Sequence, residues 1–375
     1  MSEKVKHLLI TLMICSVLAV SPGISGSDCG TEGGSSDWFV YAAEETDGED
    51  SPQSSFDYKN YGSPKIYRNM LMLKMPDVYR KLSKDIDDDE TLPIPGTLVT
   101  CTGSGGSEMT DTYVPQGICS TGDYWLVTAY DAGKKYPSVI YVIDSGEKRL
   151  VSTVSLPNKY HLGGIAFDGE RIWITGDTSD RYKGQPFVQY ITYDYLIGLI
   201  RKSITQVSKN AISEKVFIKN RPSFLEYEAG RLWVGTYIGT KETKEGYIYG
   251  YPVNGSGDGE LLNTTIFSVI TSIDSSAQGM DIDDDYLYVS SSYKGDSPGI
   301  KSSFVTKYEI SPVINGAPYL DAEYREITRI EVPKMNEEIF IEDDLMHINF
   351  ESSASKWKKP VIRTDRILAV SKPLW

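Results

Sequence analysis

One pattern recurs five times in the chain, and it constrains the fold more than any other feature of the sequence. Each copy has a short apolar run, a turn rich in Asp or Gly, and a second apolar run, a pattern typical of a β-hairpin. The copies begin at Gln116, Gly163, Pro222, Gln278 and Glu337 and read QGICSTGDYWLVTAY, GGIAFDGERIWITGD, PSFLEYEAGRLWVGTY, QGMDIDDDYLYVSSSY and EEIFIEDDLMHINFES.

The spacing of the copies indicates a repeat protein. Their first apolar residues are 47, 59, 56 and 59 positions apart, and they are Ile118, Ile165, Phe224, Met280 and Ile339. Each of these residues is followed by an aligned residue on the second apolar run, eight positions later in four copies and nine positions later in the third copy. The aligned residues are Leu126, Trp173, Trp233, Tyr288 and His347. Further strand-like runs follow the first four hairpins. Four strands per unit predicts an all-β fold, a single β-propeller of about five four-stranded antiparallel blades.

We expect the propeller to occupy residues 96–375. Its blades are predicted at about 112–160, 161–218, 219–275, 276–334 and 335–375. The last copy is one strand short, and an unpaired sheet edge is unfavourable. We therefore expect the segment 96–101, GTLVTC, to complete the last blade and close the ring.

Several residues within the copies have a structural explanation. Gly117, Gly164 and Gly279 fit an inner strand with no room for a side chain, and we expect Ser223 and Glu338 to take that position in the other copies. Asp and Gly at the turns suit the left-handed backbone of a tight hairpin, so we interpret Asp281–Asp285 as a turn rather than a calcium loop. We expect four aromatic residues to pack between blades, namely Trp125, Trp173, Trp233 and Tyr288.

The N-terminus predicts export. Residues 1–25 have the basic, apolar and small-residue parts of a secretory signal, and the apolar run Leu8–Val20 is too short to span a bilayer comfortably. We expect a flexible acidic Ser/Gly-rich linker at 26–62 and a short helical or irregular extension at 63–95. The protein is thus predicted to be secreted or extracytoplasmic, without membrane insertion after cleavage, and monomeric.

Charge and cysteine usage exclude some functions. The net charge of −14 argues against nucleic acid as a partner. Three cysteines follow the signal, Cys29, Cys101 and Cys119. A disulfide between Cys101 and Cys119 and three unpaired thiols are both compatible with the sequence.

The titratable residues leave few catalytic options. Only His161 and His347 follow the signal, so we expect no metal centre, and no cofactor motif is present. His347 aligns with Trp173 and Tyr288 and is predicted to lie in the core. The candidate catalytic groups are Glu338, Glu351 and His161, in which the two carboxylates would act as an acid–base pair if they converge.

The default ligand site is the mouth of the propeller channel, where the inner strands begin. Each blade would contribute one polar group there. The predicted ligand-binding residues are Gln116, His161, Ser223, Gln278, Glu337, Glu338 and Tyr293. Other residues beyond the second strands would lie near a rim of the disc, including Asp131, Asp177, Tyr237, Ser292 and Glu351.

The copies resemble extracellular β-propeller repeats in general. The fourth copy and its continuation, QGMDIDDDYLYVSSSYKGDSPGIKSSFVTKYEI, is similar over about thirty residues to the repeat of plant-type glutaminyl cyclases. This resemblance implies a five-bladed propeller. The family carries Glu after its apolar–aromatic pair, whereas Val289 follows Leu287-Tyr288 here, so no catalytic residue is carried over.

Two functions follow from these patterns. The first is a binding module that takes a small molecule, peptide or glycan at the channel mouth. The alternative is a hydrolase, lyase or cyclotransferase that uses carboxylate acid–base residues in the channel. Because no complete catalytic signature is present, we expect binding rather than catalysis.

Overall fold

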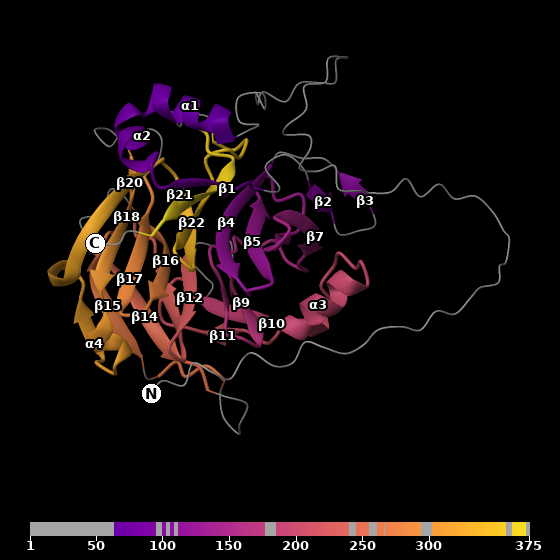
Figure 1. Ribbon diagram of the computed structural model, residues 1–375. Coiled ribbons are helices and arrows are strands. Elements are labelled where there is room, and N and C mark those ends of the chain that lie inside the picture. The colour runs from indigo at the N-terminus through magenta and orange to yellow at the C-terminus, as the bar shows by residue number, and fades with distance from the viewer. Residues whose placement is uncertain are drawn as a thin grey trace, which may run out of the picture. The chain divides into compact units, whose positions relative to one another are not determined.

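The protein is a five-bladed β-propeller, which confirms the predicted fold class (Figure 1). The computed structural model describes residues 64–94, 100–102, 106–108, 112–176, 185–239, 245–254, 261–265, 267–293, 302–357 and 362–372. The predicted signal (1–25) and linker (26–62) lie outside the described residues. The first strands of the blades contact one another in a closed ring, β4 to β8 to β12 to β16 to β21 and back to β4.

The first two blades are four-stranded antiparallel sheets whose strands follow chain order from the channel outward. Blade 1 consists of β4 (Tyr113–Ser120), β5 (Tyr124–Asp131), β6 (Val139–Asp144) and β7 (Arg149–Ser155). Blade 2 consists of β8 (Ile165–Phe167), β9 (Arg171–Gly176), β10 (Phe187–Thr192) and β11 (Val216–Phe217).

Blades 3 and 4 exchange one short strand. Blade 3 contains β12 (Phe224–Glu228), β13 (Arg231–Gly235), β14 (Gly246–Pro252) and β15 (Ser268–Ile273), and blade 4 contains β16 (Ala277–Asp283), β17 (Tyr286–Ser291), β18 (Ser303–Glu309) and β20 (Glu326–Val332). The connection within blade 4 carries β19 (Tyr319–Asp321), which pairs in parallel with β15 and gives blade 3 a fifth strand. This cross-connection ties the two blades together at their outer edge.

Blade 5 is completed by the N-terminal part of the chain, but not by the predicted segment. Its strands are β21 (Asn336–Glu342), β22 (Leu345–Phe350), β23 (Arg366–Ser371) and β1 (Ile86–Pro93), which pairs antiparallel with β23. The expected closing segment 96–101 is therefore a wrong prediction. Of that segment, residues 96–99 lie outside the described chain, and β2 (Thr100–Thr102) pairs instead with β3 (Gly106–Glu108).

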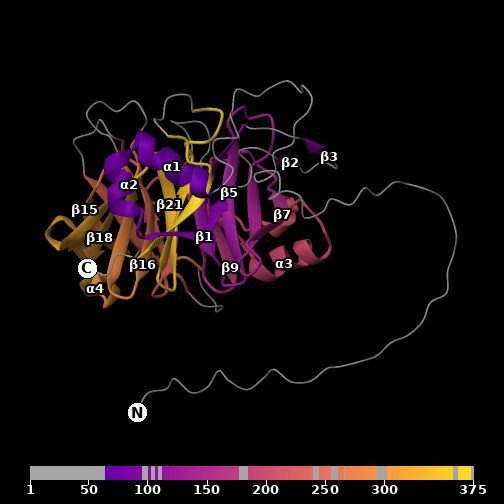
Figure 2. The ribbon, with the colours of Figure 1, turned by 45° about the horizontal axis from the view of Figure 1, so that its top comes forward.

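Two helices precede the closing strand and cover the core on that side (Figure 2). They are α1 (Pro64–Lys74) and α2 (Pro76–Leu82), each beginning at a proline, which is well tolerated in a first helical turn. Their apolar residues Tyr67, Leu71, Val78 and Leu82 are buried in the same cluster as residues of blades 1, 4 and 5. The expected helical extension is present, and its last part is the strand β1.

The remaining described helices are short. They are α3 (Tyr193–Arg201), η4 (Lys209–Ala211), α4 (Ser311–Ile314) and η5 (Glu323–Arg325). The hydroxyl of Thr192 accepts a hydrogen bond from the Tyr195 backbone N–H and caps α3. In the described part of the chain, no helix is both long and apolar enough to span a membrane.

Strand pairing corrects the alignment of the third copy. Ile165 pairs with Ile174 and Leu225 pairs with Val234, so Leu225 rather than Phe224 is the counterpart of Ile165. Leu225 stands eight residues before Trp233, the same spacing as in the other copies. Phe224 therefore takes the position that we expected for Ser223, because its ring packs against Gly235, which has no side chain to obstruct it.

The tight inner ring explains the glycines, as predicted. A Cβ atom at Gly117 would lie 2.8 Å from the Ile165 nitrogen, and one at Gly164 would lie 2.4 Å from the Leu225 nitrogen. One at Gly279 would lie 2.5 Å from the Cα atom of Glu338. Each glycine thus lets two inner strands approach closely at the channel.

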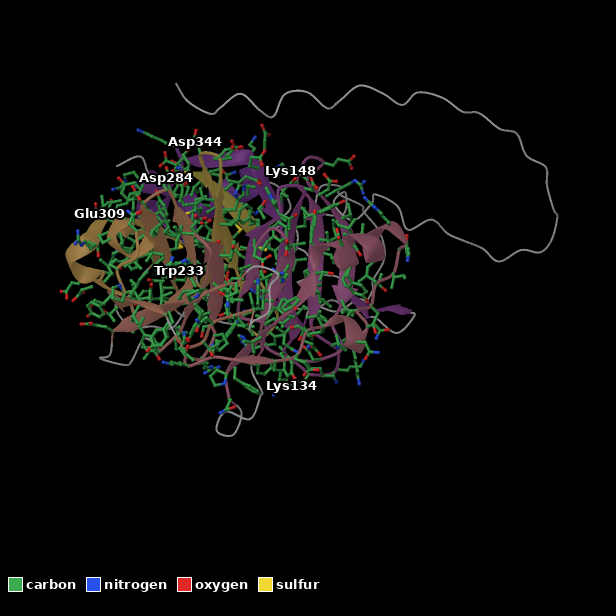
Figure 3. All side chains as sticks on the ribbon, turned by 90° about the horizontal axis from the view of Figure 1, so that it is seen from below. Lys134, Lys148, Trp233, Asp284, Glu309 and Asp344 are labelled. Carbon is green, nitrogen blue, oxygen red and sulfur yellow. The ribbon has the colours of Figure 1, made fainter. Side chains whose placement is uncertain are left out.

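The hairpin turns contain left-handed residues, also as predicted. Positive φ angles occur in the inner hairpin turn of every blade, at Gly122, Gly169, Ala229 and Gly230, Asp284 and Asp343. Figure 3 shows Asp284 and Asp344 at one end of the propeller and Lys134, from the turn after β5, at the opposite end. The propeller thus has a hairpin-turn end and a second end, where the inner strands begin.

The predicted aromatic positions are core residues. Trp125, Trp173 and Trp233 are fully buried, and each indole N–H finds an acceptor, on Glu342, Asp168 and Glu228 respectively. His347 is buried against Trp125 and stacks on Phe340, with ring centroids 4.4 Å apart. Burial lowers the pKa of His347 to about 3, with a smaller effect from Lys148, so this core histidine is neutral.

Candidate functional site

A cavity of about 170 Å³ lies at the end of the channel where the inner strands begin. All five blades contribute to its lining. The lining residues are Gln116 and Tyr130 from blade 1, His161 and Gly163 from blade 2, Arg221, Pro222, Ser223 and Tyr237 from blade 3, Gln278 and Ser292 from blade 4, and Glu351, Lys356 and Trp357 from blade 5.

A carboxyl group of blade 5 lines this cavity, and a second one lies beside it. Glu351 lies just beyond β22 and is 8% exposed, whereas Glu337 on β21, a predicted ligand-binding residue, is buried and is not among the lining residues. Their side chains hydrogen-bond to each other. Burial raises the pKa of both groups, and the charge of Glu351 raises that of Glu337 further. The arrangement is that of a pair sharing a proton.

Two glutamines hold the carboxyl pair from neighbouring blades. The amide nitrogen of Gln116 lies 3.4 Å from Oε2 of Glu351, and that of Gln278 lies 3.5 Å from Oε1 of Glu337. The Gln116 amide also donates to the carbonyl of Pro115 at 2.6 Å, which fixes its orientation. The carboxyl pair is therefore positioned by blades 1 and 4 as well as by blade 5.

Aromatic rings and a lysine form one wall. The ammonium of Lys356 lies 4.4 Å from the ring centroid of Trp357 and 5.1 Å from that of Tyr130, and it contacts the Tyr130 hydroxyl. The ring of His161 stacks on the ring of Tyr130, with centroids 4.3 Å apart. Cation–π contacts of this kind hold an ammonium in place without cancelling its charge.

His161 is neutral in this environment. Desolvation by the surrounding protein lowers the pKa of His161 to about 3, and the charges of Lys356 and Arg221 act in the same direction. The imidazole is exposed to solvent at the cavity. A neutral imidazole can both donate and accept a hydrogen bond there.

Glu338 does not belong to the cavity, although it was a candidate. It is fully buried, and its carboxyl oxygens accept hydrogen bonds from the backbone N–H groups of Leu225 at 3.4 Å, Met280 at 3.3 Å, and Ile165. These donors come from blades 2, 3 and 4. Glu338 thus links four blades at the channel axis, and Glu337 takes its place beside Glu351.

The other predicted site residues divide into two groups. Gln116, His161, Ser223, Gln278 and Glu351 come together in the lining of the cavity, and Tyr237 and Ser292 from the predicted rim join them. Tyr293 is not among the lining residues, because its hydroxyl donates to Asp274 at 2.7 Å. Asp177 lies outside the described residues.

Sequence analysis missed Tyr130, Arg221, Lys356 and Trp357. Tyr130 stands at the end of a second strand, as Tyr237 and Ser292 do, so the repeat alignment could have found it. Arg221 directly precedes Pro222 and could have been included in the mouth on the same ground. Lys356 and Trp357 lie in a connection of blade 5 with no counterpart in the other copies, so the repeat carried no signal for them.

Another group of acidic residues lies deeper in the channel. Burial raises the pKa of Glu226 and Asp281 well above their ordinary values, and each is affected by neighbouring carboxylates. Asp281 accepts a hydrogen bond from the backbone N–H of Ile341. Within the described residues, no three His, Cys, Asp or Glu side chains gather as metal ligands would.

Of the two alternatives that the sequence leaves open for the cysteines, the disulfide between Cys101 and Cys119 is not formed. Cys119 on β4 is a free thiol and is buried in the interior of the propeller. Burial raises the pKa of this thiol, and the neighbouring carboxyls of Glu226 and Glu338 add to the effect. It is therefore a protonated core residue rather than a nucleophile.

Comparison with known proteins identifies no family for this chain. No protein-family model and no curated protein matches the chain. A glutaminyl cyclase of Myxococcus xanthus is similar in structure at 12% sequence identity, with a TM-score of 0.41, over 76% of this chain and 94% of that chain.

Two further solved structures are similar to parts of the chain. Hydrazine synthase of Kuenenia stuttgartiensis is 10% identical, with a TM-score of 0.34, over 66% of this chain and 58% of that chain. YCF48, solved with a D1 peptide bound, is 12% identical, with a TM-score of 0.33, over 70% of this chain and 64% of that chain.

Proposed function

We propose that the protein binds one small polar ligand in the cavity at the channel mouth. The observation that supports this is the convergence of one polar side chain from every blade on a single cavity. They are Gln116, His161, Ser223, Gln278 and Glu351. A concave site with a few convergent polar groups is the usual form of a ligand site, and here it exists only when the ring is closed.

The size of the cavity restricts the ligand. A cavity of roughly 150 Å³ accommodates a molecule the size of benzene, whereas drug-sized ligands occupy roughly 300–1,000 Å³. At about 170 Å³ the cavity takes a small molecule or the terminal residue of a peptide. It is too small to enclose a glycan chain, so among the three ligand classes expected from sequence we favour the first two.

A thermal-shift screen of small polar compounds tests the proposal. Ligands that raise the melting temperature of the protein should lose this effect in Gln116→Ala and Gln278→Ala, because each removes an amide from the cavity. Gln206→Ala is the matched control, since Gln206 is exposed and lines a separate groove between blades 1 and 2. Ligands whose effect persists in both cavity variants would contradict binding at this site.

Acid–base catalysis is the second candidate, favoured by the Glu337–Glu351 pair. Two carboxyl groups that share a proton supply one donor and one acceptor, as hydrolysis, elimination or cyclisation requires. Mass spectrometry of each ligand after incubation with the protein decides between the two candidates. Catalysis predicts a changed product that disappears in Glu351→Gln, whereas complete recovery of every ligand unchanged leaves binding as the function.

We also propose that the protein is exported. The support is the order of basic, apolar and small residues in positions 1–25. Expression of the full chain, followed by intact-mass measurement of the protein outside the cytoplasm, should show loss of about 25 residues. An unprocessed chain retained in the cytoplasm would contradict this.

A further inference from the structure

The connection between β22 and β23 carries three of the residues that line the cavity. It runs over residues 351–365 and is longer than the equivalent connections of the other blades, which run over 132–138, 177–186, 236–245 and 292–302. Its first part, residues 351–357, here called the cavity turn, contributes Glu351, Lys356 and Trp357. Connections of this length are uncommon in compact domains and are often functional. The repeated strand pairing of the blades does not account for the shape of the cavity turn.

A single guanidinium from the second part of the same connection holds the cavity turn. Nη2 of Arg363 donates to the carbonyl oxygens of Ser353 and Ala354, both at 2.9 Å, and its Nε donates to that of Ser352 at 3.4 Å. These three residues are buried, and a buried carbonyl needs a donor. A guanidinium presents several donors in a fixed plane, so one side chain can serve three successive carbonyls.

These bonds act on the backbone next to the lining residues. The Ala354 carbonyl also accepts a hydrogen bond from the Trp357 backbone N–H at 2.9 Å, and the Ala354 N–H donates to the Glu351 carbonyl at 3.2 Å. Ala354 thus connects the guanidinium to Trp357 and to Glu351. Arg363 itself is not among the residues that line the cavity. Its effect on a ligand would therefore pass through the cavity turn.

We propose that Arg363 is a positioning residue, which keeps the cavity turn in the shape that binds the ligand. The inference rests on the proposed function, because positioning presupposes a ligand in the cavity. Without the guanidinium, three buried carbonyls lose their donor and the turn rearranges to expose them to water. Glu351 and Trp357 then leave their places in the lining. The blades remain, because Arg363 lies outside the described strands.

Fluorine NMR of the protein labelled with 5-fluorotryptophan measures the environment of Trp357 without any ligand. The resonance is assigned by its loss in Trp357→Phe. In Arg363→Ala we expect it to shift or to split into several lines, whereas the resonances of the buried Trp125, Trp173 and Trp233 stay unchanged. The melting temperature should fall by no more than about 2–4 °C, since the loss is confined to one connection.

Chemical rescue separates positioning from a general loss of structure. Guanidinium ion added to Arg363→Ala, far below denaturing concentrations, should restore the wild-type resonance of Trp357, because it can donate to the same carbonyls. Methylammonium at the same concentration is the matched control, since it has the charge without the planar set of donors. Arg80→Ala is the control variant and should leave the resonance unchanged, because Arg80 is exposed on α2 and pairs with Asp77.

Binding supplies the second measurement. Compounds that raise the melting temperature of the wild-type protein should lose this effect in Arg363→Ala and regain it when guanidinium is present. An unchanged Trp357 resonance in Arg363→Ala contradicts the inference, as does a change that is equally large for the buried tryptophans. Rescue by methylammonium as complete as that by guanidinium also contradicts it.

The failure of this inference is distinguishable from that of the proposed function. A compound that loses its effect in Gln116→Ala but keeps it in full in Arg363→Ala contradicts the positioning role alone. Compounds whose effect persists in both Gln116→Ala and Gln278→Ala contradict binding in the cavity, whatever the resonance of Trp357 shows.

Discussion

Glu337 and Glu338 are neighbours in sequence and have opposite roles. Glu337 is bonded to side chains, namely Glu351 and the amide of Gln278, behind the cavity at the mouth. Glu338 is bonded to backbone N–H groups of blades 2, 3 and 4 at the axis. Because successive residues of a strand point to opposite sides, a shift of one residue separates a group that serves a site from one that holds the ring together.

The comparison shows that burial and a raised pKa do not by themselves identify a functional residue. Burial is the largest cause of the raised pKa of both glutamates. Their partners distinguish them, because backbone donors fix Glu338 in place, whereas the partners of Glu337 lead to a cavity that a ligand can enter. We therefore regard Glu338 as structural and the Glu337–Glu351 pair as the candidate site.

The largest effect that would test this distinction is the replacement of Glu338. Glu338→Leu removes the acceptor of three buried N–H groups, each of which costs about 1–3 kcal/mol when left without a partner. We expect a loss of about 3 kcal/mol or more in the free energy of unfolding, measured by urea denaturation. Glu337→Leu should cost less, about 1 kcal/mol, because its side-chain partners can turn toward water in the cavity. Equal losses would show that the two glutamates are not distinct in role.

A smaller effect should follow from widening the axis. Gly164→Ala would place a methyl group 2.4 Å from the backbone nitrogen of Leu225, so the inner strands of blades 2 and 3 must separate. We expect a loss of about 1–3 kcal/mol in unfolding free energy. Gly198→Ala is the control, since no atom lies near a Cβ at that position of α3 and alanine favours a helix by about 0.5–1 kcal/mol. A loss in both variants would argue against close packing as the cause.

The smallest effect we expect is in the pH dependence of stability. Burial raises the pKa of Glu337, Glu338 and Glu351, so the folded protein keeps protons that the unfolded chain releases above its ordinary pKa of 4.5. The contribution of these three groups to the free energy of unfolding is therefore fully present below pH 4.5 and is lost as pH rises through the raised pKa values. His161 and His347, whose pKa values are lowered from 6.5, act in the opposite direction below pH 6.5, so urea denaturation between pH 6.5 and pH 8, at about the same ionic strength, measures the decline due to the glutamates.

One variant separates the contribution of Glu337 to this pH dependence from that of Glu338 at the channel axis. Glu337→Gln keeps the size and hydrogen-bonding capacity of the side chain but removes its titration. The groups that face Glu337 and remain are Glu351, Glu338 and Lys356. We expect the pH dependence to become shallower in this variant. An unchanged slope would assign the whole effect to Glu338 and the deeper carboxylates.

The fold could be predicted because its signals are local. Turn residues such as Gly169 and Asp284 need a left-handed backbone, and the eight-residue spacing is set by the hairpin itself. The closing strand was missed because Ile86–Pro93, IDDDETLP, lies at the outer edge of a sheet, where acidic residues can face solvent. Only Ile86, Thr91 and Leu92 are buried there among residues whose burial is described, too few for a periodic pattern.

The site could be predicted in part for the same reason. Gln116, Ser223 and Gln278 occupy equivalent positions, each two residues before the aligned apolar residue of its inner strand, so the repeat places them together. The choice between Glu337 and Glu338 could not be made, because it depends on which side of β21 faces the cavity. Lys356 could not be found either, since its position depends on tertiary contacts with Tyr130 and Trp357.

The pairing of β1 with β23 determines when blade 5 can be completed during synthesis. Synthesis produces Ile86–Pro93 before the strands of all five inner hairpins and Arg366–Ser371 after them, so β1 has no partner until residue 371 has emerged. Such distant pairings form late in folding. Blade 5 is therefore completed after the other four, and it carries Glu337, Glu351 and Lys356. A nascent or truncated chain can thus hold four blades and still be unable to bind the proposed ligand. Ligand binding would then report a completed protein.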